Sequence, residues 1–145
     1  MGAGNAYIAF GKNGSLGATL STTSTSSTSF LQITGESGGY FGVSVAGGDF
    51  NHDRYSEVLI GAYAAGSNAG EVNLLFGKSP LTTPILAANL AGSSGNPAGT
   101  KFFGEGSSKA GVLVDNAGAV NHDGIEDFIC GAYDATVSSR SGAGR

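Results

Sequence analysis

The stretch NHDRYSEVLIGAY, residues 51–63, decides the architecture because it returns as NHDGIEDFICGAY at residues 121–133. The two copies lie about 70 residues apart, and self-similarity of this kind is the signature of a repeat architecture. Small differences in spacing between the repeated stretches predict loop insertions between fixed strands. AGNAYIAFGK (3–12) returns as AGEVNLLFGK (69–78), and TGESGGYFG (34–42) returns more loosely as FGEGSSKAG (103–111).

The composition favours strands and turns over helices. Glycine supplies 26 of the 145 residues, and no window carries the apolar period of a helix. Short apolar runs bounded by Gly, Asn and Ser recur instead, at about four per repeat, which is the make-up of one β-propeller blade. The predicted fold is all-β, with four antiparallel strands per blade and about two blades' worth of strands. Strands are expected at residues 6–10, 30–34, 41–46, 57–60, 71–76, 100–103, 111–114 and 128–130.

The order of the repeated strands predicts that the chain starts and stops part-way through a blade. Residues 1–34 are expected to form the last two strands of one blade, residues 35–103 a complete blade, and residues 104–145 the first strands of the next. Two blades cannot close a ring, so further blades are the expected partners, either from a longer chain or from other copies. The final SGAGR resembles the start of another AG strand, which favours a chain that continues.

An acidic loop, GGDFNHDRYSE at residues 47–57, lies between the first two strands of the complete blade. Its oxygens at alternate positions suit one hard cation, and calcium (Ca2+) fits such an all-protein set better than Mg2+ does. A polar turn without metal is the alternative, because Asp and Asn also favour turns. The expected ligands are the side chains of Asp49, Asn51, Asp53 and Glu57 and the backbone carbonyl of Tyr55.

This loop is not an EF-hand, because Ile60 stands at the twelfth loop position and strands flank it. A second copy, GAVNHDGIED, carries the corresponding ligands, with Ala119 in place of the first aspartate. Asp115 lies nearby and is a possible substitute. The second loop has Gly124 where the first has Arg54, at a position where a left-handed turn favours glycine. The expected second set is Asn121, Asp123, Ile125 through its carbonyl, and Asp127.

His52 and His122 occupy the same position in the two loops but do not form a zinc site with the single thiol, Cys130. Zinc needs three or four convergent ligands, and these histidines belong to different blades. We expect them to pack or hydrogen-bond at the shoulder of each loop. Cys130 lies in the apolar run DFICGAY and is expected to be a small core residue rather than a reactive thiol.

Charge and hydropathy exclude two classes of partner. Seven basic and eleven acidic residues give a net charge of -4, and no Lys/Arg cluster is present to bind nucleic acid. No apolar run reaches the about 18 residues of a membrane span. No export signal opens the sequence, so such a signal is expected to lie outside it. The Ser/Thr-rich run at residues 14–30 is expected to be a long hairpin loop or edge.

The whole unit YFGVSVAGGDFNHDRYSEVLIGAY resembles the FG-GAP repeat, the blade motif of the integrin alpha-subunit propeller and of many extracellular proteins. Phe41 and Gly42 match its FG, and GAY at 61–63 stands for its GAP. The family's calcium loop, D-x-N-x-D-G-x-x-D, is matched except for Arg54 and Glu57. In the second repeat FG has become Ala-Gly at residues 110–111.

This resemblance implies a seven-bladed propeller in which calcium stiffens one face while the opposite face binds protein ligands. The expected function is adhesion or recognition of a protein or glycan ligand by an extracellular or cell-surface protein, without enzymatic activity. Two alternatives stay open. One is an accessory propeller module of a secreted hydrolase or lyase, and the other is a structural ring in which several copies share blades.

Overall fold

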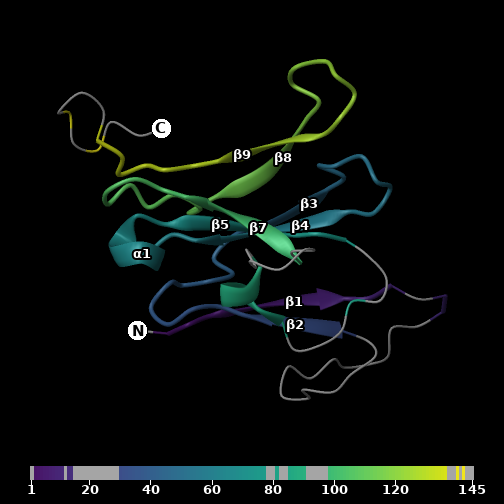
Figure 1. Cartoon of the computed structure of the whole chain (residues 1–145), viewed down its shortest axis with the longest axis horizontal. Coiled ribbons are helices and arrows are strands. Elements are labelled where there is room, and N and C mark those ends of the chain that lie inside the picture. Colours follow the sequence, from purple (N-terminus) through teal and green to yellow (C-terminus); the bar gives the residue numbers. More distant parts are fainter. Residues whose placement is uncertain are drawn as a thin grey trace.

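A computed structural model describes residues 2–11, 13–14, 30–77, 81, 85–90, 98–136, 140 and 142. Three sheets are stacked in it: β1 and β2 lie below a central sheet, and β8 and β9 lie above it (Figure 1). Most of the Ser/Thr-rich run falls outside the described residues. The strands are β1 (Asn5–Ala9), β2 (Phe30–Thr34), β3 (Val45–Gly48), β4 (Glu57–Ala62), β5 (Glu71–Leu75), β6 (Ile85–Leu86), β7 (Gly99–Phe103), β8 (Val114–Gly118) and β9 (Asp127–Cys130).

The central sheet has four strands in the order β3-β4-β5-β7, and every pair in it is antiparallel. This order is the up-and-down meander of a propeller blade. The second sheet has the order β1-β2-β6, and the third consists of β8 and β9. A short helical turn, α1 (Ala65–Asn68), joins β4 to β5, and a 3-10 turn, η1 (Ala87–Asn89), follows β6. The predicted all-β fold of antiparallel sheets is confirmed, and the described strands do not close into a ring.

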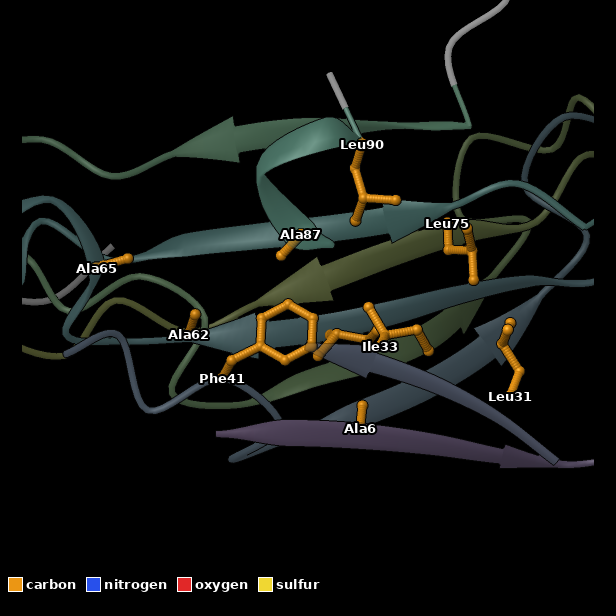
Figure 2. Close-up of a cluster of buried hydrophobic side chains, with 10 residues drawn as sticks. Ala6, Leu31, Ile33, Phe41, Ala62, Ala65, Leu75, Ala87 and Leu90 are labelled. Atoms are coloured by element: carbon orange, nitrogen blue, oxygen red, sulfur yellow. The ribbon is translucent and has the colours of Figure 1, made fainter. Parts of the chain in front are cut away.

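Two cores form because the central sheet is covered on both faces. Successive strand residues point to opposite faces, so Ile60 and Leu75 face the β1-β2 sheet while Leu59 and Leu74 face the β8-β9 sheet. The first core gathers side chains from β1, β2, β4 and β5 with Ala87 and Leu90 from the η1 turn (Figure 2). The four side chains from β4 and β5 that face these cores are each at most 4% exposed: Leu59, Ile60, Leu74 and Leu75.

Two strands start later than predicted. The stretch 41–46 was expected to be a strand, but β3 spans Val45–Gly48; likewise the predicted strand 111–114 shares only Val114 with β8, which spans Val114–Gly118. The reason is local: Tyr40 and Gly42 have positive φ of 53° and 87°, which is incompatible with extended backbone. The Phe41 N–H instead donates to the Ala3 carbonyl at 3.2 Å, which ties this segment to the neighbouring sheet.

Strand β6 was not predicted from sequence. It has only two residues, and it pairs in parallel with β2, although it lies between β5 and β7 along the chain. Within the described residues no helix is long and apolar enough to cross a membrane. The β3-β4 and β8-β9 connections lie at the same end of the sheets, on the right of Figure 1, and α1 lies at the other end. The two acidic loops therefore share one face of the molecule.

Candidate metal site in the β3-β4 loop

The acidic loop connects two paired strands directly, since Gly48 of β3 pairs with Glu57 of β4. His52 and Arg54 have positive φ of 59° and 74°. This left-handed geometry folds the loop back on itself, so that short polar side chains reach the loop's own N–H groups.

Three of the predicted ligand side chains converge inside this loop. The Asp53 N–H donates to Asp49 Oδ1 at 3.1 Å and to Asn51 Oδ1 at 2.9 Å, so both oxygens lie close to one nitrogen. Asp53 accepts in turn from the Tyr55 N–H at 2.8 Å and from the Asn51 amide at 3.0 Å. The Arg54 N–H donates to Asp49 Oδ2 at 3.1 Å. Asp49, Asn51 and Asp53 are thus brought together.

Glu57 lies beneath the loop and is fully buried, at 0% exposure. Its Oε2 accepts from the Phe50 N–H at 2.9 Å, and its Oε1 accepts from the Gly77 N–H at 3.3 Å. Burial raises the pKa of this carboxyl above its ordinary value, and the charge of Asp53 adds to the rise, while the two N–H groups act in the opposite direction. Glu57 therefore connects the loop to the end of β5.

The β8-β9 loop repeats this hydrogen-bond pattern. The Asp123 N–H donates to Asn121 Oδ1 at 3.0 Å, and the Ile125 N–H donates to Asp123 Oδ1 at 2.8 Å. The Asn121 amide donates to Asp123 Oδ2 at 2.9 Å. These bonds from Ile125 and Asn121 lower the pKa of the Asp123 carboxyl. Asp127 accepts from the Val120 N–H at 2.8 Å, as Glu57 does from the Phe50 N–H in the first loop.

The two loops differ at their first ligand position, where Ala119 stands for Asp49. Asp115 does not take the place of the missing aspartate. Its side chain is exposed, and its Oδ1 accepts from the N–H of neighbouring Asn116 at 2.8 Å. The one-residue insertion of the second repeat produces a β-bulge between Asn116 and Gly118. His52 and His122 are both exposed, and what they share is a left-handed φ rather than packing.

Sequence reasoning missed Glu126, which links the two loops. Its Oε2 accepts from the Asp49 N–H at 2.7 Å and from the Asn116 amide at 3.0 Å. Gly48 permits this approach, because a Cβ there would lie 2.6 Å from the same carboxylate oxygen. The only sequence signal is that Glu126 stands where the first repeat has Ser56, an extra acid beside the expected ligands.

The donor chemistry of the first loop fits calcium. Three carboxylates and one amide supply only oxygen, and each N–H bond uses one of the several lone pairs on its acceptor. Within the described ranges no three His, Cys, Asp or Glu groups lie close enough to hold a metal ion. Asp49, Asn51 and Asp53 are bonded to the loop's own N–H groups and Glu57 to the N–H groups of Phe50 and Gly77, so the three carboxylates do not converge on one point in this structure.

A comparison with protein families identifies this region. The model of the FG-GAP repeat matches residues 41–74. The chain contains an FG-GAP repeat. The match covers β3, the acidic loop, β4 and most of β5, so all of the first ligand set falls inside the FG-GAP repeat. A search of curated proteins found no match to the chain.

Arg54 is one of two residues in the FG-GAP loop, with His52, that carry a Cβ at a left-handed φ. We expect Arg54→Gly to raise the free energy of unfolding by about 0.5–1 kcal/mol, because a left-handed φ costs a residue with a Cβ about 1–2 kcal/mol and glycine loses part of this gain as backbone entropy. Denaturant unfolding measures the change. Arg54→Ala removes the charge but keeps the Cβ, and a gain of equal size in that variant would contradict the explanation.

Proposed function

We propose that this chain is a calcium-stabilised FG-GAP propeller module of an extracellular or cell-surface protein, and that it recognises a protein or glycan ligand. The observation that carries the proposal is the recurrence of one loop geometry in two repeats. In both loops an Asn-x-Asp pair has a left-handed residue at its middle position and another directly after the Asp, and a carboxylate that starts the next strand accepts a loop N–H.

In this proposal the cation is held by Asp49, Asn51, Asp53, Glu57 and the Tyr55 carbonyl. It supplies positive charge that offsets the mutual repulsion of three carboxylates. The protein's own residues do the rest: the left-handed turns present the oxygens, and Glu57 connects the loop to β5. The second loop, which lacks the first aspartate, is expected to bind more weakly because affinity follows the number of charged ligands.

The proposal predicts a calcium-dependent gain in stability. Calcium at a few hundred times its dissociation constant is expected to raise the free energy of unfolding by about 3 kcal/mol, because it binds the folded loop only. Calorimetric titration and thermal melts in calcium and in chelator measure this. Asp49→Ala and Asp53→Ala are expected to abolish the gain.

The matched control is Asp134→Ala, which removes a carboxylate that pairs with Lys109 at 3.2 Å, outside either acidic loop. This variant is expected to keep the full calcium-dependent gain. A folded wild-type chain that neither binds calcium nor melts higher in its presence would refute the metal site. It would leave the FG-GAP loop as a hydrogen-bonded turn.

A further inference from the structure

A cavity of about 390 Å³ lies at the α1 end of the molecule (Figure 1). Its walls are the segment 36–39 after β2, α1 with the residues that follow it up to Gly70, and the end of β7. The volume falls within the range of about 300–1,000 Å³ that is usual for small-ligand sites. Glycine and alanine make up most of the wall. The larger side chains that line the cavity are Glu36, Glu71, Lys101 and Phe103.

Two charged side chains of this cavity are buried. The side chains of Lys101 and Glu71 are 6% and 7% exposed, and Lys101 Nζ lies 3.6 Å from Glu71 Oε1. Lys101 Nζ also donates to Glu36, which is half-exposed. Glu71 Oε1 accepts from the Asn73 amide at 3.0 Å, and the buried Asn73 Oδ1 has no hydrogen-bond partner among the described residues. Because an ammonium has three N–H donors, the network keeps both a donor and an acceptor for a further group.

The blade architecture does not require these charges. The register of β1 with β2 repeats that of β5 with β7, which gives three equivalent residues: Asn5 for Glu71, Gln32 for Lys101 and Thr34 for Phe103. The same strand pair is therefore built with neutral side chains in the neighbouring sheet. A buried ion pair seldom stabilises a fold more than well-packed uncharged residues do. A binding role explains charges that the strands themselves do not need.

We propose that this cavity binds a neutral saccharide. The inference rests on the proposed function, for which it names the ligand class and the place of recognition. Two carboxylates repel an anionic ligand, and the ammonium of Lys101 already pairs with them and repels a cationic one. A sugar hydroxyl both donates and accepts, so neighbouring hydroxyls can bond to a carboxylate and to the ammonium together.

Phe103 supplies an apolar surface beside these polar groups. It is 72% exposed, and it pairs with Glu71 across the two strands, so both side chains lie on the same face of the central sheet. A pyranose ring presents C–H groups on its faces and hydroxyls around its edge. It can therefore lie against the aromatic ring while its hydroxyls reach the charged groups.

Saturation-transfer NMR of the full chain with glucose, galactose, mannose and N-acetylglucosamine tests the proposal. We expect transfer to at least one of these sugars. Lys101→Gln and Phe103→Thr are each expected to weaken its binding at least about tenfold. Both variants introduce the residue that β2 carries at the equivalent position, so they are expected to fold, which circular dichroism checks. Leu113→Thr, which changes a 70% exposed side chain outside the cavity, is expected to leave binding unchanged. Absence of transfer to all four sugars from the folded chain, or binding that survives both cavity variants, overturns the proposal.

Chemical shifts test the place of binding in the wild-type chain. On titration with the bound sugar, the amide signals of Gly39 and Gly104, which line the cavity, are expected to shift. The amide of Gly124 in the second acidic loop is expected to stay unchanged. Shifts confined to residues away from the cavity overturn the proposed site.

The result is separable from that of the calcium proposal, because α1 and the acidic loops lie at opposite ends of the sheets (Figure 1). A chain that calcium stabilises but that binds none of the sugars overturns this inference alone. A chain that binds a sugar in the cavity but gains no stability in calcium overturns the metal site and supports the saccharide site.

Discussion

Gly61→Ala is expected to destabilise the chain by about 3 kcal/mol or more, because its added methyl meets backbone that cannot move aside. The Cβ would lie 1.9 Å from the Gly111 carbonyl oxygen and 2.4 Å from Ser44 Oγ. The backbone around it is fixed by two bonds, from the Gly61 N–H to the Ser44 carbonyl at 2.9 Å and from the Gly42 N–H to the Gly61 carbonyl at 3.0 Å. Relief requires the central sheet and the β8-β9 sheet to separate, which exposes the second core.

The matched control is Gly131→Ala, in the same GAY motif of the second repeat. Its methyl would meet Val112 Cγ1 at 3.7 Å, which is ordinary contact, and its φ is not left-handed. We expect a change in stability within about 0.5 kcal/mol. Denaturant unfolding of both variants measures the difference. Equal losses would show that the motif needs glycine for backbone reasons rather than for contact between sheets.

The repeats allowed the fold to be predicted because each strand carries its own apolar pattern. The expected strand at 30–34 is β2 to the residue, and that at 57–60 lies inside β4. The start of β3 was not predictable from pattern alone. Phe41 continues the apolar alternation of that strand, yet it is buried in the first core at 4% exposure, because left-handed residues on both sides turn it there. Strand β6 is too short to carry any pattern.

The candidate site also has residues that the sequence predicts and residues that it does not. Asp49, Asn51 and Asp53 were predictable as a converging set because they alternate along one turn, and short-range hydrogen bonds fix them. Glu126 was not, because its contact with the Asp49 N–H joins residues from different repeats across two sheets. The burial of Glu57 was also not predictable from the sequence, since it depends on how the loop folds over the end of β5. Binding of metal stays a prediction.

Glu57→Ala is expected to lower the free energy of unfolding by about 3 kcal/mol, even without metal. The change removes the acceptor of both the Phe50 N–H and the Gly77 N–H, and it leaves a void where the carboxylate is 0% exposed. A donor deprived of its acceptor in a buried place costs about 1–3 kcal/mol. Loss of both hydrogen bonds also removes the link between the loop and the end of β5. Unfolding in chelator measures this structural role apart from any bound cation.

Asp127→Ala is the matched control, because Asp127 holds the same position in the second loop but is only half-buried and is bonded to the Val120 N–H. Its loss is expected to be about 1 kcal/mol, since water reaches the freed donor. Glu57→Gln separates charge from hydrogen bonding: its amide oxygen can still accept from one of the two N–H groups, and the unfavourable burial of a charge is relieved. We therefore expect the free energy of unfolding of Glu57→Gln in chelator to lie between those of the wild type and Glu57→Ala. A Glu57→Ala variant as stable as the wild type there would mean that this side chain serves only a bound cation.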